Sequence, residues 1–375
     1  MAKKNKKKQL EEWAEEQEQV APLDPAEIRT LKREIALLKR KYMARMSGES
    51  LIVDEVTNAF SRPPDLVFPK APSVKSQGKG VEEIAVLVVS DTQIGKTTST
   101  YDTSVADSRL QMLAKKAIEI TRMRRSTAKI RDLRIYLIGD MVEGEDIFPH
   151  QAHTIDSSVF EQAVKNTPAI LARMIMTLSS EFTKVKVVCV PGNHGRNGPK
   201  GRGGHPKTNW DSVCYEVLRL MLLGSDHSPS SLRKRMEFVN TGKFYAVDRV
   251  FDWGNLMVHG DQITGGFAGF PWYGTAKKAW GWIDSIPEPW EYLFFGHFHT
   301  YAQAVLNRRM FLCNGTTESD NTYAQANLAA AGFPCQRFSF FNANHGLIAD
   351  NQIFLTEKGE RVPQRMRASE WLNEG

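Results

Sequence analysis

The chain has 375 residues, 41% of them hydrophobic and 25% charged, a composition typical of a globular protein with one large domain or two smaller ones. No apolar run approaches the ~20 residues that a membrane-spanning helix needs, and none follows the basic N-terminus as in a secretory signal. The four cysteines form no C-x-x-C pair, which excludes a zinc ribbon and disfavours a disulfide scaffold. The expected compartment is therefore a reducing cytoplasm, with no membrane partner.

The formal net charge of +6 does not by itself indicate a nucleic-acid-binding protein. Residues 1–48 contain 12 Lys and Arg against 8 Asp and Glu, and the rest of the chain contains 37 against 35. The main part of the chain is thus close to neutral, so an argument for nucleic acid must come from local basic clusters.

Residues 1–60 are predicted to form a basic helical extension. Asp24 and Pro25 mark a helix start, with aspartate as N-cap and proline at the first helical position. Apolar residues then repeat at spacings of three and four, at Ile28, Leu31, Ile35, Leu38 and Tyr42. Two heptads are marginal for an independent coiled coil. Packing on the main domain is the favoured interpretation, with a partner helix or DNA as alternatives.

The remaining chain divides into three parts. Residues 61–82, which contain four prolines, are predicted to be a linker. Residues 83–358 are predicted to form the main domain, and residues 359–375 a C-terminal tail. Within the main domain, strands are predicted at 84–90, 133–139, 185–190, 255–258, 292–295, 310–313, 338–341 and 353–356. Helices are predicted at 105–125, 158–180 and 209–223. This alternation predicts a layered α/β domain.

Polar side chains follow the first five of these strands, at the point where each strand ends. They are Asp91 and Gln93, Asp140 and Glu143, Asn193 and His194, His259, and His297 and His299. Loops beyond the carboxyl ends of strands are where open α/β sheets bind ligands. Carboxylate, amide and imidazole donors without thiolate suit manganese, iron or zinc in a hydrolytic site. Two divalent ions that share one bridging carboxylate would use every group in this set.

The order and wording of these five segments resemble the calcineurin-like metallophosphoesterase superfamily. The resemblance spans about residues 84–316, and the segment Ser90-Asp91-Thr92-Gln93-Ile94-Gly95 is most similar to the opening of the SbcD-type DNA repair nucleases. It implies a four-layer β-sandwich flanked by helices, here with an N-terminal helical extension. It also implies a two-metal phosphoesterase, with manganese favoured over iron and zinc.

The resemblance further implies a role for each site residue. Asp140 would bridge both ions, and His194 would lie beside the scissile phosphate with Glu143 holding its ring. The remaining ligands would divide into Asp91, Gln93 and His299 for one ion, and Asn193, His259 and His297 for the other. Two departures stand out: Gln93 replaces the usual histidine, and Gly195 replaces a common Asp or Glu. The degenerate, inactive alternative is disfavoured because only Gln93 among the proposed ligands departs in type.

DNA is the favoured substrate, cleaved in repair, recombination or replication. A glycine-rich loop after His194 carries Arg196, Lys200, Arg202 and Lys207, which would bind a polyanion. Aromatic residues between His259 and His297 could stack on bases, although packing explains at least half of them. The alternatives are a phosphatase for small phosphoesters or phosphoproteins and a non-catalytic DNA-binding or scaffold protein. Only 76 residues follow His299, too few for the separate DNA-capping domain of full-length repair nucleases. A homodimer or a partner ATPase is also left open as a partner of this chain.

Overall fold

The computed structural model describes residues 66–70, 72–73, 78–148, 151–198, 205–224, 228–265, 270–319 and 333–356, all within one compact unit, Ala59–Gly375. The predicted N-terminal extension, much of the linker and the C-terminal tail lie outside these residues. Among the described helices, none combines the length and the apolar character needed to cross a membrane. The first strand starts at Val81, three residues earlier than predicted.

The larger sheet has six strands in the order β11-β10-β1-β2-β3-β4. Strands β1, β2, β3 and β4 are mutually parallel, while β10 is antiparallel to β1 and to β11. The strands are β1 Val81–Val89, β2 Ala128–Leu137, β3 Lys184–Cys189, β4 Met236–Asn240, β10 Cys335–Asn342 and β11 Gly346–Phe354. In register, Val88 of β1 lies beside Tyr136 of β2, which lies beside Val188 of β3. The carboxyl ends of the parallel strands therefore meet at one edge of this sheet.

The smaller sheet has five strands in the order β5-β6-β7-β9-β8. They are β5 Tyr245–Val250, β6 Trp253–Val258, β7 Tyr292–Phe295, β8 Ala302–Leu306 and β9 Arg309–Cys313. Strands β6, β7 and β9 are parallel to one another, with β5 and β8 antiparallel at the two edges.

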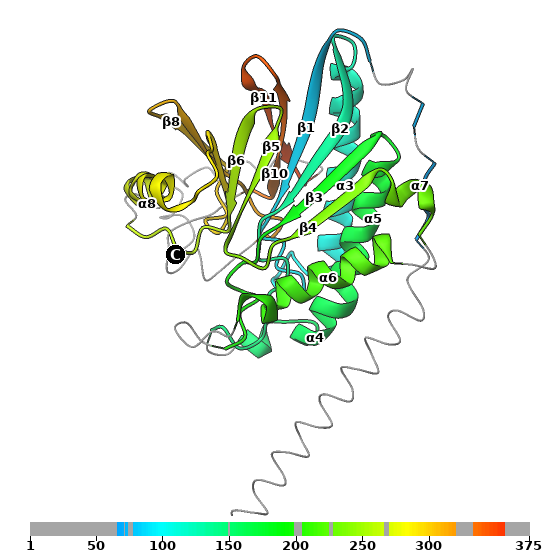
Figure 1. Cartoon of the computed structure of the whole chain (residues 1–375). Helices are drawn as coiled ribbons and strands as arrows, with labels where there is room; N and C mark the ends of the chain where they lie inside the picture. The colour runs from blue at the N-terminus through cyan, green and yellow to red at the C-terminus, as the bar shows by residue number, and fades with distance from the viewer. Residues whose placement is uncertain are drawn as a thin grey trace, which may run out of the picture. The chain divides into compact units, whose positions relative to one another are not determined.

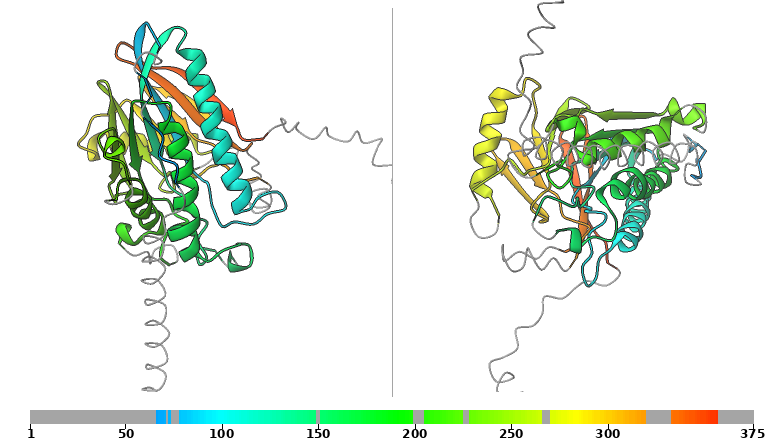
Figure 2. Two further views of the ribbon diagram at one scale, coloured as in Figure 1. Left: turned by 90° about the vertical axis from the view of Figure 1, so that its right-hand side faces the viewer. Right: turned by 90° about the horizontal axis from the view of Figure 1, so that it is seen from below.

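Helices cover the outer face of each sheet (Figure 1). Helices α3 Thr103–Arg124, α5 Thr167–Ser179 and α6 Trp210–Leu223 lie on the larger sheet, and Figure 2 shows them side by side. Helix α8 Trp272–Ser285 packs on the smaller sheet. Short helical segments complete the described part: η2 Gln151–His153, α4 Val159–Glu161, η3 Gln162–Asn166, η4 Pro206–Thr208 and α7 Ser230–Arg233.

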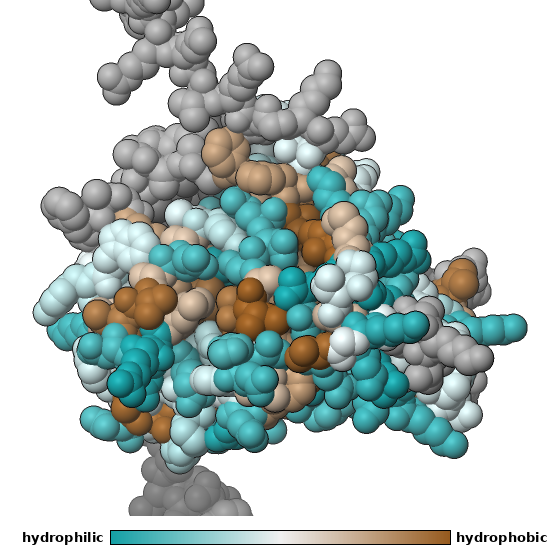
Figure 3. Space-filling view, turned by 90° about the horizontal axis from the view of Figure 1, so that it is seen from above, coloured by the Kyte–Doolittle hydropathy of each residue, from teal (hydrophilic) through white to brown (hydrophobic). Residues whose placement is uncertain are grey.

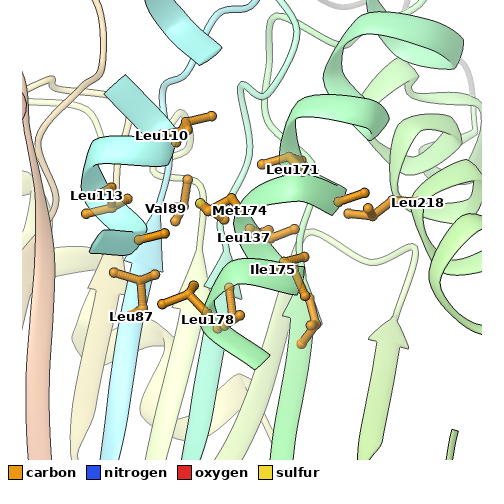
Figure 4. Close-up of a cluster of buried hydrophobic side chains, with 14 of the residues drawn as sticks. Leu87, Val89, Leu110, Leu113, Leu137, Leu171, Met174, Ile175, Leu178 and Leu218 are labelled. Carbon is orange, nitrogen blue, oxygen red and sulfur yellow. The ribbon is translucent and has the colours of Figure 1, made fainter. Parts of the chain in front are cut away.

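The period-two alternation of β1 divides its side chains between two cores. Leu87 and Val89 face the helices and pack with Leu110 of α3 and Leu171 of α5 (Figure 4). Val86 and Val88 instead face the smaller sheet, in a core that includes Phe294. A third core lies between the smaller sheet and α8. The order helices, sheet, sheet, helix confirms the predicted four-layer α/β sandwich.

Hydrophobic residues form only small groups, separated by hydrophilic side chains, on the face drawn in Figure 3. Most large hydrophobic side chains of the described residues are instead buried in the three cores.

Three strands, β4, β5 and β8, were not predicted, and neither were the helix α8 and the single turn α7. Strand β5 breaks the hydrophobic alternation because Asp248 points into the interior, where Tyr136 Oη donates to it at 3.0 Å and Lys186 lies 2.9 Å away. The predicted helix at 158–180 is present as α4, a single π-helical turn and α5. The basic cluster at the end of α3 forms ion pairs, Arg122 and Arg125 with Glu181 and Arg124 with Glu83, so it serves the fold.

Candidate active site

The polar loops of both sheets converge at one edge of the sandwich. The loop after β1 hydrogen-bonds to the loop after β2, with the backbone N–H of Gln93 donating to the backbone carbonyl of Asp140 at 2.9 Å. The backbone N–H of His297, after β7, donates to both carboxylate oxygens of Asp91 at 2.9 and 3.1 Å. The strand-end rule used on the sequence is thereby borne out in space, because residues from both sheets share one rim.

Backbone strain is concentrated in this rim. Eight non-glycine residues of the described chain have positive φ, a region that costs about 1–3 kcal/mol per residue. Five of the eight are predicted metal ligands: Asp91, Gln93, Asp140, His297 and His299. Strain of this kind persists only where the surrounding structure enforces it, and it marks functional sites.

One half of the site, here called the Asp140 group, consists of Asp140, Asn193, His259 and His297. His259 Nε2 lies 2.9 Å from Asp140 Oδ2 and 3.1 Å from Asn193 Oδ1. One ligand atom each of Asp140, His259 and His297 lies within 4.8 Å of the others. Oxygen and nitrogen donors pointing at a common centre fit a divalent ion. These residues could therefore hold a metal.

Hydrogen bonds outside the group fix the orientation of its ligands. His259 Nδ1 lies 3.0 Å from the Ile138 carbonyl, which leaves Nε2 facing the centre. Asp140 Oδ1 accepts the backbone N–H of His194 at 2.7 Å, so Oδ2 is the oxygen that faces His259. Metal ligands in proteins are commonly held by such partners.

The local charge favours a cation at this centre. Burial lowers the pKa of His259, but the carboxylates of Asp140, Asp91 and Asp261 together raise it more, to about 10. Burial raises the pKa of Asp140, but His259 and His194 lower it well below its usual range. Burial and the neighbouring His259 lower the pKa of His297 to about 3, so its imidazole is neutral. A proton or a divalent ion can therefore satisfy the carboxylate.

Asp211, which the sequence analysis missed, ties the two central loops together. Its buried carboxylate accepts backbone N–H bonds from Asp140 at 2.9 Å, Met141 at 3.0 Å, Val142 at 3.2 Å and Gly192 at 2.8 Å. Burial, and then the nearby Asp140 charge, raise the pKa of Asp211 to about 6. The signal available in the sequence was the helix start at Asn209, which places an acidic residue in the first turn.

Asp211 and Asn209 also explain the unusual Gly195. A Cβ atom built at Gly195 would lie 2.3 Å from Asn209 Oδ1 and 2.8 Å from the Asp211 nitrogen. An Asp or Glu side chain has no room there without displacing α6. The acidic contact expected at Gly195 is thus supplied to this rim from α6.

His194 is buried beside the Asp140 group, with its ring held on the Nδ1 side. Nδ1 lies 2.9 Å from the Glu143 carbonyl and 3.1 Å from Glu143 Oε2. Gln151 Nε2 in turn donates to Glu143 Oε1 at 3.0 Å. Burial lowers the pKa of His194, but Asp140 and Glu143 raise it more, to about 9. The ring can therefore carry a proton at neutral pH.

The other half, here called the Gln93 group, consists of Asp91, Gln93 and His299 together with Lys96 and Glu318. His299 Nε2 lies 3.4 Å from Asp91 Oδ1, and its Nδ1 lies 2.6 Å from Glu318 Oε1. Lys96 Nζ donates to Gln93 Oε1 at 3.0 Å and pairs closely with Glu318. Burial lowers the pKa of Lys96, but Glu143 and Glu318 raise it more, to above its ordinary value.

Lys96 lies in the loop after β1, three residues beyond Gln93, but lysine is not a metal-ligand type and was not selected. Glu318 was missed because only the first five predicted strands were searched for polar residues at their ends. Glu318 follows β9, whose core was predicted at 310–313, and the segment after it joins the same rim. Thr316 Oγ1 donates to the Asp91 carbonyl at 2.8 Å, and Arg109 Nη1 donates to the Thr317 carbonyl at 2.5 Å. Extending the rule to this strand would have located the acid.

The predicted substrate-binding residues are only partly described. Arg196 is half-buried and Lys207 is exposed, while Lys200 and Arg202 fall outside the described residues. Of the aromatic residues, Phe270 and Trp282 are buried, in line with the packing alternative. On α8, the exposed ones are Trp272, Tyr273 and Trp280.

No protein-family model matches the chain, and no curated protein matches it. Solved structures with a similar arrangement include vacuolar protein sorting 29 from Cryptosporidium parvum, at 14% identity and a TM-score of 0.34 over 73% of this chain and 99% of that one. A predicted phosphoesterase from Streptococcus pneumoniae has 9% identity and a TM-score of 0.29 over 73% and 99%. An archaeal phosphodiesterase has 10% identity and a TM-score of 0.31 over 72% and 99%. Similarity this low does not bear on substrate or partner.

Proposed function

We propose that this protein is a metal-dependent phosphoesterase that cleaves phosphodiester bonds, with DNA as its substrate. The observation that carries the proposal is the Asp140 group, whose oxygen and nitrogen donors meet beside the buried His194, whose pKa is raised to about 9. A metal site alone would fit many hydrolases. A metal site with a fixed general acid next to it fits ester cleavage with a poor leaving group.

In this proposal, the Asp140 group would hold a divalent ion. When bound, the ion supplies a Lewis acid for a phosphoryl oxygen and lowers the pKa of an attacking water. His194 protonates the departing alkoxide from Nε2, because its Nδ1 is held by Glu143. Gln151 keeps the Glu143 carboxylate in place and thereby the ring. Asp211 holds the loops of Asp140 and Gly192 in register through its four backbone contacts.

A row of aromatic rings supports a polynucleotide substrate. His297 of the Asp140 group lies 5.0 Å from the ring of Phe298, which lies 5.6 Å from Phe270, which lies 4.3 Å from Trp272. Trp272 is 46% exposed, so the row begins at His297 of the Asp140 group and ends in solvent. An exposed aromatic ring such as that of Trp272 can stack on a base, a contact worth about 1–3 kcal/mol.

The direct test is manganese-dependent cleavage of end-labelled single- and double-stranded DNA. p-Nitrophenyl phosphate and its bis-ester are assayed alongside, with His194→Ala and Asp140→Asn to exclude contaminants. DNA cleavage that both variants lose is the expected result. Turnover of the monoester alone would favour the phosphatase, and inactivity on every substrate would favour the non-catalytic alternative.

A second test addresses the aromatic row. Trp272→Ala should weaken DNA binding about 5-fold or more. The same variant should leave turnover of bis-p-nitrophenyl phosphate unchanged, because that substrate has no bases. Trp280→Ala is the matched control, since Trp280 is also an exposed tryptophan of α8 but is not part of the row. Equal losses in both variants would contradict a specific role for Trp272.

A further inference from the structure

The side-chain amide of Gln93 directs its nitrogen, and not its oxygen, toward the histidines of the site. Its oxygen accepts the hydrogen bond from Lys96 Nζ at 3.0 Å. Its nitrogen lies 3.4 Å from His194 Nε2 and 3.4 Å from His299 Nε2. An amide nitrogen donates hydrogen bonds and has no lone pair for a metal. Gln93 therefore presents hydrogen atoms where a divalent ion would need a donor.

Lys96 fixes this orientation. If the amide were reversed, the 3.0 Å hydrogen bond from Lys96 Nζ to Gln93 Oε1 would be lost and the NH₂ group would face the ammonium. The ammonium itself is held by Glu318, whose side chain is only 2% exposed, while that of Lys96 is 14% exposed. A lysine buried to this extent needs a partner, so the Lys96–Glu318 pair is a built feature.

Glu318 also contacts His299, the histidine of the Gln93 group. Its other oxygen lies 2.6 Å from His299 Nδ1. Asp91 is engaged as well, since both of its oxygens accept the His297 backbone N–H. The three expected ligands of the second ion thus already form a chain of contacts with Lys96 and Glu318. These residues do not fit a second divalent ion.

We propose that the protein holds one divalent ion, in the Asp140 group, and that the Lys96 ammonium supplies the second positive charge of the site. Lysine is charged at neutral pH and binds phosphate as a compact point charge. In this arrangement Lys96 attracts a phosphoryl oxygen of the substrate while Gln93 and Glu318 hold it in place. The inference deepens the proposed phosphodiesterase function and rests on it only for the identity of the substrate.

The number of ions can be counted without any substrate. Metal-free protein is dialysed against saturating Mn²⁺ and the bound manganese is measured, together with its electron paramagnetic resonance spectrum. We expect one ion per chain and the six-line spectrum of an isolated Mn²⁺. Two ions per chain with a spin-coupled spectrum would overturn the proposal. A chain that binds one ion but cleaves no phosphoester would refute the proposed function and leave this inference standing.

Two variants separate the lysine from the glutamine. Lys96→Ala combined with Gln93→His should bind two ions, because the ammonium is gone and an imidazole is added. Gln93→His alone should still bind one, because Lys96 remains. A second ion in Gln93→His alone, or a single ion in the double variant, would show that Lys96 does not set the count.

Lys186→Ala is the matched control for lost ion pairing, because Lys186 pairs with Asp248 and Glu237 away from the site. It should leave the count at one. The wild-type count and the Gln93→His variant keep the proposal testable even if the double variant does not fold.

Discussion

The two halves of the site contain the same kinds of residue, an aspartate, an amide and histidine, but their polar atoms face different partners. In the Asp140 group the outer atoms bind backbone, as with His259 Nδ1 and Ile138, and the inner atoms are left facing one centre. In the Gln93 group the inner atoms face Lys96 and Glu318. Residue type at a motif position therefore does not decide which polar atoms are left facing the site. The neighbouring groups that hydrogen-bond to its polar atoms decide which atoms remain available.

The largest difference between the halves should appear when one histidine is removed from each. His259→Ala removes a completely buried ligand at the centre of the Asp140 group. Because changes to outer partners of metal ligands already cost about 10–100-fold, loss of the ligand should weaken Mn²⁺ binding by more than ~100-fold. His299→Ala should leave Mn²⁺ affinity within about 10-fold. Isothermal titration measures both, and equal losses would contradict the asymmetry between the halves.

His194 lies between the halves and should affect catalysis without affecting metal. His194→Ala should lower the rate of DNA cleavage by about 10²–10⁴-fold, because the leaving alkoxide loses its proton donor. Turnover of bis-p-nitrophenyl phosphate should fall much less, since nitrophenolate leaves without a proton. Manganese affinity should stay unchanged. A comparable loss on both substrates would argue against the role of general acid.

His194 should also set the alkaline limb of the pH profile of DNA cleavage. The pKa of His194 is raised to about 9, and a general acid must be protonated to act. The rate of DNA cleavage should therefore be retained at neutral pH and fall as pH rises through about 9. The falling limb should be absent in His194→Ala. A limb that persists in the variant would have to come from another group.

Asp211 supports the loops of the Asp140 group, so its substitution should lower the free energy of unfolding. Asp211→Asn replaces a carboxylate that accepts four backbone N–H groups by an amide with one oxygen. Unpaired buried donors cost about 1–3 kcal/mol each, so the free energy of unfolding in urea should drop by about 2–4 kcal/mol. Asp284→Asn, at an exposed position of α8, is the control and should change it little. Similar values for the two variants would show that the four contacts are dispensable.

The two amides give the smallest and sharpest contrast. Asn193→Ala should weaken Mn²⁺ binding by about 10–100-fold, because Asn193 Oδ1 faces the same centre as His259 Nε2. Gln93→Ala should change it by less than about 3-fold, because its oxygen is already bound to Lys96. The two titrations are run under the same buffer and salt conditions. A large loss in Gln93→Ala would place a metal in the Gln93 group.

Much of the fold and the rim was predictable because it depends on local patterns. The alternation of β1 predicts a buried strand, and its two faces pack into two different cores. Strands β5 and β8 were missed because β5 buries the charged Asp248 and β8 is an edge strand with largely exposed side chains. Helix α8 escaped prediction because Gly274 and Gly281 weaken its helical pattern and its apolar residues are only partly buried.

The sequence alone determined which side chains end the strands, and since carboxyl ends of parallel strands share an edge, it determined that they would meet. It could not determine which atoms of those side chains would be free. Glu318 comes from the opposite end of the domain sequence from Gln93, and Asp211 comes from a helix that no strand-end rule includes. Glu318 pairs with Lys96, which donates to Gln93, and Asp211 accepts the backbone N–H of Asp140. These contacts decide which polar atoms at the rim remain free. They are set by distances of a few ångströms between remote segments, which only the packed tertiary structure fixes.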